Sequence, residues 1–484
     1  MTPNLVATSV FLGFFALVTV VGFFAAHWKS ADLRALHEWG LAGQRFGTII
    51  SWFLIGGDFY TAYTVIAVPA LVYSVGAFGF FALPYTIIVY PLVFAMMPRL
   101  WTVCRENRCI TAADFVHIRY GSKWLALAIA ITGIIATMPY IALQLVGMQV
   151  VIEGLGFRGE LPLAAAFIIL ALYTYSSGLR APAIIAFVKD IMIYIVILAA
   201  IIIIPIKLGG YRAIFTTADQ ALHTRGFGLL LKPQQMVPFT TLALGSALAA
   251  FLYPHTMTGV LSSSCANTVR KNAIFLPAYT VLLGFIALLG YMAIAAGVRP
   301  DRATEVVPAL FNKMFPDWFA GFSFAAIAIG ALVPAAIMSI GAANLWTRNV
   351  WKAFVNPYIS MSGEANVAKL TSLIIKLGAL TFIIFLPTEY AIDLQLLGGI
   401  WILQTLPSIV AGISKMRLNA RGLLIGWVSG MAVGTLMARA MQWRPVFTIP
   451  IGTESASVYI GLIALSVNLL ATAIGGLTFT RSGR

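Results

Sequence analysis

The stretch WFLIGGDFYTAYTVIAVPALVY, residues 52–73, is apolar and long enough to cross a membrane, yet it carries Gly-Gly-Asp at 56–58. A transmembrane helix needs about 20 predominantly apolar residues. Glycine is about 1 kcal/mol less favourable than alanine inside a helix, and a charged side chain at membrane depth is costly. These residues therefore predict a helix that is interrupted in the middle of the span.

A second span, LGSALAAFLYPHTMTGVLSSS at 244–264, carries Pro254 and His255 in its middle. Proline removes a helix hydrogen bond and clashes with the preceding turn, so this span is also predicted to break. Irregular backbone at membrane depth is tolerated only where it lines a cavity or is buried in protein. Two broken helices in corresponding halves of a chain indicate a transporter built from inverted repeats, with its site at the breaks.

The composition supports a membrane protein that crosses the bilayer many times. Hydrophobic residues make up 60% of the 484 residues, charged residues make up 10%, and the mean hydropathy is +0.93. Soluble domains carry about 25% charged residues. The three cysteines are too few for a disulfide framework, no Cys or His cluster suggests a metal site, and no soluble stretch is long enough for a catalytic or DNA-binding domain.

Hydropathy predicts an all-α polytopic membrane protein with about 13 transmembrane helices. The predicted spans are 4–27, 47–75, 78–98, 124–155, 161–176, 183–206, 237–261, 275–297, 319–346, 368–387, 389–414, 422–441 and 456–478. With the N-terminus outside, the cytoplasmic connections hold 19 Lys and Arg residues and the outer ones 10. Positive charge concentrates in cytoplasmic loops, which explains the net charge of +15 without a nucleic-acid partner and favours a cytoplasmic C-terminus.

Six stretches, in order along the chain, resemble the sodium:solute symporter family, and within it most of all the bacterial monocarboxylate (lactate, pyruvate, acetate) permeases. They are IGGDFYTAYTVIAVPALVYSVGAFGFFALPY (55–85), TMPYIALQLVGMQ (137–149), SSGLRAPAIIAFVKD (176–190), FLYPHTMTGVLSSSCANTVRKN (251–272), GALVPAAIMSIGAANLWTRNVWK (330–352) and GGIWILQTLPSIVAG (398–412). The resemblance covers nearly the whole chain. It implies a bacterial protein of the cytoplasmic (inner) membrane with a leucine-transporter-type 5+5 inverted-repeat core.

The resemblance also implies the domain organisation. Residues 1–484 form a single membrane transport domain. Its expected parts are an extra N-terminal helix at 4–27, repeat 1 at 47–206, repeat 2 at 237–414, and two extra C-terminal helices at 422–478.

The sodium site that the resemblance implies departs from the family pattern. In the family, backbone oxygens of the first core helix and two hydroxyl side chains of the eighth hold the ion. The first group falls at Gly56 and Phe59, and the hydroxyl pair falls at Val333 and Pro334, on the helix that also carries Gly330. Hard cations require oxygen ligands, which neither valine nor proline side chains supply. We therefore expect a vestigial sodium site and no resident metal.

Lys189 is the candidate replacement for the cation, since it lies within the predicted fifth core helix, 183–206. In some proton-driven relatives of the wider superfamily, a lysine on this helix stands in for sodium. Burial disfavours the charged form of an amine, so a buried lysine can exchange a proton near neutral pH, whereas an arginine cannot. Two alternatives remain open: the ammonium reaches the cytoplasmic headgroups, or it pairs with a buried carboxylate such as Asp58.

Two carboxylates complete the coupling candidates. Asp190 follows Lys189 and points about 100° away around the helix, so it either balances the local positive charge or faces another helix. Asp58 either holds Lys189 or a backbone donor in place, or is itself protonated during transport. A second intramembrane lysine, Lys376, is expected to reach the headgroups or to form a salt bridge, because its helix is peripheral in the family.

The substrate-site candidates come from the breaks and from the third and tenth core helices. They are Phe59, Tyr60, Thr61, Tyr140, Gln144, Tyr253, His255, Trp401 and Gln404. Free helix N-termini at the breaks offer N–H groups to an anionic substrate. His255 is either a structural hydrogen-bond donor or a substrate or proton site. The pairs Tyr140/Gln144 and Trp401/Gln404 each share a helix face, so they either line the site or bridge helices.

Together these features predict a secondary active transporter that imports small monocarboxylates by alternating access, with a proton more favoured than sodium as the coupling ion. The expected partners are the substrate and the lipid bilayer, with no cofactor and no nucleic acid. A sodium-coupled symporter of another small organic solute is the main alternative. A membrane-embedded enzyme is disfavoured because the five histidines are scattered along the sequence, and a sensor because such relatives carry an extra signalling domain.

Overall fold

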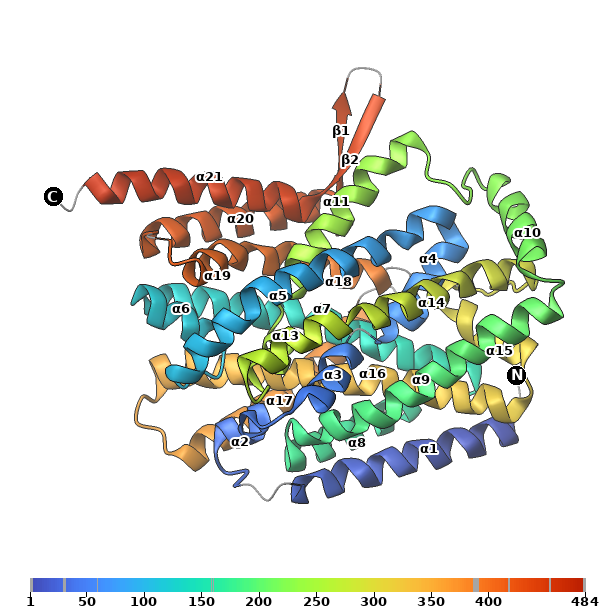
Figure 1. The fold of residues 1–484 in the computed structure, drawn as a ribbon, viewed down its shortest axis with the longest axis horizontal. Helices are drawn as coiled ribbons and strands as arrows, with labels where there is room; N and C mark the ends of the chain where they lie inside the picture. The colour runs from blue at the N-terminus through green and yellow to red at the C-terminus, as the bar shows by residue number, and fades with distance from the viewer. Residues whose placement is uncertain are drawn as a thin grey trace.

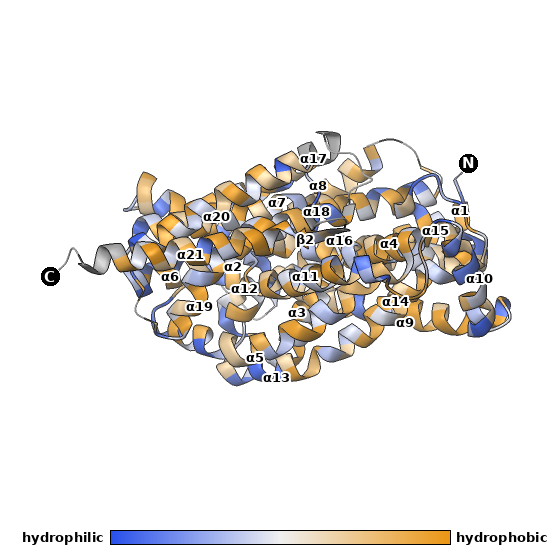
Figure 2. Cartoon of the chain, turned by 90° about the horizontal axis from the view of Figure 1, so that it is seen from above, coloured by the Kyte–Doolittle hydropathy of each residue, from blue (hydrophilic) through white to orange (hydrophobic). Residues whose placement is uncertain are grey.

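The structure is a computed structural model that describes residues 3–28, 32–58, 60–157, 159, 161–385, 391–416, 418–451 and 454–481. Long helices run side by side along the longest axis of the molecule, and the labelled N-terminus and C-terminus lie at opposite ends of that axis (Figure 1). Hydrophobic residues cover the bodies of the helices, while hydrophilic residues gather towards the two ends, around α6 on one side and α10 on the other (Figure 2).

The helices of the first half are α1 (Leu5–Phe24), α2 (Leu36–Leu41), α3 (Thr48–Gly57), α4 (Val68–Val75), α5 (Ala82–Glu106), α6 (Ala112–Tyr120), α7 (Lys123–Gly154), α8 (Leu161–Ser177), α9 (Arg180–Lys207) and α10 (Tyr211–His223). Those of the second half are α11 (Pro233–Ala250), α12 (Pro254–Leu261), α13 (Ala266–Phe275), α14 (Pro277–Ala295), α15 (Val306–Met314), α16 (Asp317–Leu345), α17 (Met361–Phe385), α18 (Ala391–Ile402), α19 (Leu406–Ile413), α20 (Ala420–Ala440) and α21 (Ile460–Arg481). Short 3₁₀ and π-helical segments join several of them, among them a π-helical turn at Tyr63–Ala67.

Each of the thirteen predicted spans coincides with one of these helices or with a pair of them. Among the described residues, nine helical runs are long and apolar enough to cross a membrane, or ten when the bent pair α11 and α12 is counted as one span. The prediction of a polytopic helical membrane protein is confirmed. One element was not predicted: strands β1 (Val446–Ile451) and β2 (Glu454–Tyr459) pair antiparallel as a hairpin between α20 and α21.

Burial separates the centre of the bundle from its edge. The most apolar window of the run that contains α16 is 100% buried, against 28% for the windows of α1 and α20. A helix that is buried all round needs small side chains so that its neighbours approach closely, and α16 is rich in alanine and glycine. Helix α16 therefore lies at the core, where it packs against α7, α9, α12 and α17.

Candidate functional site

The first predicted break lies between α3 and the π-helical turn that begins at Tyr63. Helix α3 ends at Gly57, and polar groups satisfy the backbone beyond it. The Thr61 side chain accepts a hydrogen bond from the Tyr63 amide at 3.0 Å, and Gln144 Oε1 of α7 accepts one from the Ala62 amide at 3.0 Å. Freed backbone groups must find such partners at membrane depth. Thr61 and Gln144 therefore hold the broken backbone in place.

Lys189 reaches into this break from α9. Its side chain is 0% exposed, and Nζ donates hydrogen bonds to the carbonyl oxygens of Gly57 and, at 3.2 Å, of Tyr60. The carboxylate of Asp190 lies 3.1 Å from Nζ. The alternative that the amine reaches the headgroups is therefore wrong. The carboxylate that pairs with it is Asp190 rather than Asp58.

Asp190 is fixed from the other side by α14. The Tyr279 hydroxyl donates to Asp190 Oδ2 at 2.7 Å, and the Tyr279 ring packs against Tyr60 with the ring centroids 4.5 Å apart. Both expectations for Asp190 are confirmed, because it balances the lysine charge and also faces another helix, α14. A 100° step around a helix separates neighbouring Cα atoms, but long side chains can turn back towards each other, as they do here.

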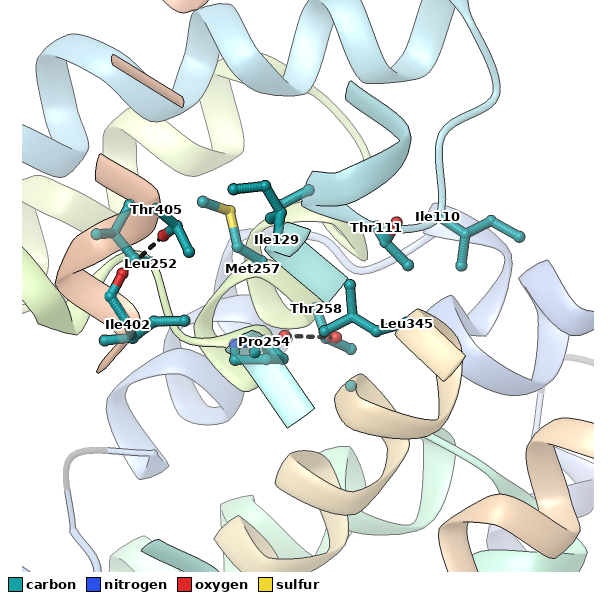
Figure 3. Close-up of a pocket in the computed structure, with 13 residues that line it drawn as sticks. Ile110, Thr111, Ile129, Leu252, Pro254, Met257, Thr258, Leu345, Ile402 and Thr405 are labelled. Atoms are coloured by element: carbon teal, nitrogen blue, oxygen red, sulfur yellow. Dashed lines mark hydrogen bonds between the residues drawn. The ribbon is translucent and has the colours of Figure 1, made fainter. Parts of the chain in front are cut away.

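The second predicted break is confirmed between α11 and α12, which are bent by 46°. Tyr253 precedes Pro254, and its hydroxyl donates to the Gln395 carbonyl of α18 at 3.1 Å. Thr258 donates to the Pro254 carbonyl at 2.8 Å. Beside the break lies a cavity of about 20 Å³, lined by residues of α7, α12, α16 and the start of α6 (Figure 3). That volume holds about one water molecule, so it is too small for an organic substrate.

Asp58 and His255 join the two breaks. Asp58 Oδ2 lies 3.4 Å from His255 Nε2, and both side chains are buried. The His255 ring packs against Tyr253 at 5.1 Å and against Tyr140 at 5.4 Å between centroids. Four sequence-predicted residues from three helical segments thus meet at one place in the middle of the bundle.

Several buried polar atoms around this meeting point have no hydrogen-bond partner among the described residues: Asp58 Oδ1, His255 Nδ1, Tyr63 OH and Gln395 Oε1. A buried polar group without a partner costs roughly 1–3 kcal/mol, and native proteins pair nearly all of them. The Tyr63 ring packs against Tyr85 of α5 with the ring centroids 6.3 Å apart. This group of atoms is therefore suited to receive a small polar ligand.

Trp401 and Gln404 lie away from this group, and the structure corrects their placement. Trp401 Nε1 donates to Thr435 of α20 at 3.1 Å, and Gln404 Oε1 accepts from Asn468 of α21 at 3.1 Å. The alternative that this pair bridges helices fits these contacts. Helix α18 ends at Ile402, and Gln404 lies in the 3₁₀ turn Leu403–Thr405 that follows, where both side chains meet the two C-terminal helices. Phe59 lies outside the described residues.

Among the described residues, the positions implied for sodium on α16 add no side-chain oxygen to the first break. A Cβ built on Gly330 lies 3.7 Å from the Tyr60 carbonyl oxygen, so this glycine faces the break directly. Val333 and Pro334 are both buried and carry no side-chain oxygen. A Cβ built on Gly56 meets the Tyr279 ring at 2.2 Å. The carbonyl oxygens of the first break accept hydrogen bonds from Lys189. The described residues at the positions implied for sodium therefore do not fit a resident Na⁺.

Lys376 of α17 is placed differently from what the sequence suggested. Its side chain is 1% exposed, so it does not reach the headgroups, and no carboxylate of the described residues lies within ion-pair distance. Nζ donates to Ser372 Oγ at 2.8 Å, and Ser372 donates to Ser339 of α16 at 3.2 Å. The expectation that it reaches the headgroups is wrong, and within the part of the chain that the structure describes it forms no salt bridge.

Three residues that complete the site were not identified from the sequence: Tyr63, Tyr279 and Gln395. Each is a single polar residue within an apolar span, which is a weak signal when taken alone. Tyr63 and Tyr279 offered a further hint, because one lies within the broken segment and the other near the start of an apolar span. Within the described ranges, no three His, Cys, Asp or Glu side chains gather as metal ligands.

Comparison with known proteins identifies the family. Residues 39–430 match the sodium:solute symporter family. The chain is 62% identical over 473 residues to a monocarboxylate transport permease protein of Rhizobium johnstonii, covering 97% of this chain and 96% of that one. It is 31% identical to the symporter YodF of Bacillus subtilis, covering 98% and 94%.

Among solved structures, the fold resembles that of a substrate-bound, outward-open Na⁺-coupled sialic acid symporter with a TM-score of 0.79. The two chains share 16% identity, and the match covers 97% of this chain and 96% of that one. This likeness confirms the leucine-transporter-type fold, while the division into repeats at the stated boundaries stays a prediction. The chain belongs to the sodium:solute symporter family and is a membrane transporter of solutes, not an enzyme.

Proposed function

We propose that this protein imports small monocarboxylates such as lactate, pyruvate or acetate together with a proton, and that Lys189 is the coupling residue. The 62% identity to a monocarboxylate transport permease supports the substrate class. The observation that supports a proton as the coupling ion is the position of the Lys189 amine. It lies against the Gly57 and Tyr60 carbonyls of the broken helix, with Asp190 at 3.1 Å.

The chemistry of this amine suits proton coupling. A protonated lysine has three N–H donors, and three oxygens surround it here: two carbonyls of the break and one carboxylate oxygen. Loss of the proton removes the charge and one N–H donor, which weakens the hydrogen bonds between α9 and the broken segment. Protonation of Lys189 is thereby linked to the arrangement of the broken helix, and alternating access can follow from rocking of the repeats around the site.

The substrate occupies the meeting point of the two breaks once the repeats have rocked apart, because the cavity beside it in this structure holds only about one water molecule. The Tyr63 hydroxyl and the Nδ1–H of a neutral His255 supply hydrogen bonds to the substrate carboxylate, and the rings of Tyr140 and Tyr253 form its apolar wall. Because a neutral imidazole carries one N–H, His255 Nε2 accepts from a protonated Asp58 carboxyl, 3.4 Å away, and that uncharged carboxyl does not repel the anion. Asp58 therefore orients the histidine, while the histidine binds the substrate.

The test is uptake of labelled lactate, pyruvate, acetate and alanine into proteoliposomes under separately imposed pH and sodium gradients. We expect an inward proton gradient to drive accumulation of the monocarboxylates, a protonophore to abolish it, and a sodium gradient alone to have no effect. Accumulation that requires sodium would overturn proton coupling.

The residue assignment is tested by Lys189→Gln, with Lys376→Met as the matched control for loss of a buried amine. Lys189→Gln is expected to lose proton-driven accumulation but to keep exchange of labelled for unlabelled substrate at equal pH, because exchange requires no net movement of the coupling ion. Full accumulation by Lys189→Gln would exclude Lys189 as the coupling residue.

A further inference from the structure

A second cavity lies about the ends of α4, α11 and α18, beside the β1–β2 hairpin. Its volume is about 570 Å³, which falls within the range typical of small-molecule sites. Phe78, Phe81 and Phe227 form an aromatic wall. The hairpin is tied to α11 by a hydrogen bond from the Tyr459 amide to Thr241 at 3.2 Å, and Figure 1 shows it standing beside α11.

Two opposite charges also line this cavity: Arg444, just after α20, and Asp393, in the first turn of α18. Arg444 is exposed, and no carboxylate of the described residues lies within ion-pair distance of its guanidinium. Asp393 is half-buried and lies beyond ion-pair distance of Arg444 but within the range of its electrostatic attraction. An arginine guanidinium free to bind a carboxylate with two parallel hydrogen bonds is a strong recognition element.

The floor of the cavity leads to the site at the breaks. Leu242 and Leu396 line the floor, and the Tyr459 hydroxyl donates to the Leu396 carbonyl at 2.7 Å. The preceding residue, Gln395, accepts the hydrogen bond of Tyr253 through its carbonyl, and Tyr253 packs against His255. Tyr459 and Tyr253, here called the tyrosine layer, thus connect the cavity lining to the residues proposed to bind substrate.

We propose that this cavity is a capture site for monoanionic carboxylates with an apolar tail. Arg444 binds the carboxylate, the three phenylalanine rings receive the tail, and Asp393 repels a second negative charge and so excludes dicarboxylates. The role in transport rests on the proposed function and on the expected orientation, which places this end of the bundle outside the cell. Substrate held there passes the tyrosine layer when the transporter opens.

Calorimetry on the full-length protein in detergent tests the site directly, with 2-naphthylacetate as the probe. Loss of a charge-assisted hydrogen-bond pair is expected to weaken binding by about tenfold or more in Arg444→Gln, and less in Arg444→Lys. The neutral amide of the probe is expected not to bind. Arg439→Gln, an exposed arginine of α20 outside the cavity lining, is the control and is expected to bind as the wild type does. An unchanged Kd in Arg444→Gln, or equal binding of the amide, would overturn the proposal.

Two further comparisons fix the location and the selectivity. His255→Gln is expected to leave the Kd for 2-naphthylacetate unchanged, because that residue lies beyond the tyrosine layer; a loss of binding would place the probe at the breaks and refute a separate capture site. A naphthalene dicarboxylate is expected to bind Asp393→Asn but not the wild type, and equal binding to both would refute the role of Asp393.

Uptake measurements separate this proposal from the proposed function. For lactate added outside whole cells, Arg444→Gln is expected to raise the KM by about tenfold with little change in maximal rate. If the wild type takes up no monocarboxylate while Arg444 still binds the probe, the proposed function fails and the capture site stands. If uptake occurs with an unchanged KM in Arg444→Gln, the capture role alone fails.

Discussion

Two of the lysines that the structure describes are buried in this bundle, and they have different surroundings. Lys189 lies against two backbone carbonyls of a broken helix and pairs with Asp190, which Tyr279 holds in turn. Lys376 has one hydroxyl partner, Ser372, and no carboxylate nearby among the described residues. A buried ammonium without a counter-charge is strongly disfavoured. The contrast shows that burial alone does not make an amine functional; the oxygens arranged around it do.

The largest expected effect comes from removing the amine of Lys189. In Lys189→Met, Asp190 is left as a buried carboxylate without its partner, which is expected to destabilise the protein by about 3–5 kcal/mol and to abolish accumulation. Thermal unfolding in detergent and proteoliposome uptake measure both effects. Lys189→Met combined with Asp190→Asn is expected to regain much of the stability but none of the accumulation; a single variant as stable as the double would show that the pair is not coupled.

A smaller change makes the surroundings of Lys189 resemble those of Lys376. Asp190→Asn removes the counter-charge but leaves the two carbonyls in place. The loss of a hydrogen bond to a charged group is expected to lower the free energy of unfolding by about 1.5–3 kcal/mol. Without the nearby negative charge the neutral amine is favoured, so proton-driven uptake is expected to require a more acidic outside, by about one pH unit. An unchanged pH profile of uptake would separate Asp190 from proton binding.

Gly56→Ala tests the support behind the ion pair. The added Cβ meets the Tyr279 ring at 2.2 Å, so the ring must move and its hydroxyl loses its position at Asp190. We expect the free energy of unfolding to fall by about 1–3 kcal/mol, as in other overpacked cores, and substrate uptake to be slower. Gly13→Ala on α1 is the control, because nothing lies within 4 Å of its added Cβ. Equal stability of the two variants would argue against tight packing at Tyr279.

The smallest effect is expected at the other lysine. Lys376→Met replaces a buried amine that lacks a counter-charge by an apolar side chain of similar length, which is often neutral or stabilising. The change in stability is expected to lie within about 1 kcal/mol, with proton-driven uptake unchanged. A loss of accumulation comparable to that of Lys189→Met would break the contrast between the two lysines and assign Lys376 a role in transport.

The sequence predicted the features that depend on local chemistry. The broken backbone after Gly57 and the bend before Pro254 follow from residues that helices tolerate poorly, and the spans follow from hydropathy. The resemblance then drew attention to Lys189, and the structure brings its amine to the first break. The sequence offers two carboxylates as partners, Asp58 as an anchor and Asp190 as a balancing charge, and the structure places Asp190 at 3.1 Å from the amine.

Errors arose where the rotation of a helix decides what a side chain meets. Trp401 lies at the end of α18 and Gln404 in the 3₁₀ turn after it, and their side chains meet α20 and α21. Lys376 was expected at a lipid-facing or salt-bridged position and is instead enclosed between α16 and α17. Nothing in the sequence links Tyr279 to Asp190, 89 residues away along the chain, although its hydroxyl donates to Asp190 at 2.7 Å.

The sequence by itself determined that this chain is a membrane-spanning helical transporter, where its spans lie, and where two of its helices break. Hydropathy and helix-breaking chemistry are properties of a few neighbouring residues, so they can be read without knowing what packs against them. Only the tertiary structure decided which polar side chain meets which carbonyl. One residue turns a helix by about 100°, and the packing of its neighbours selects the face that points inward.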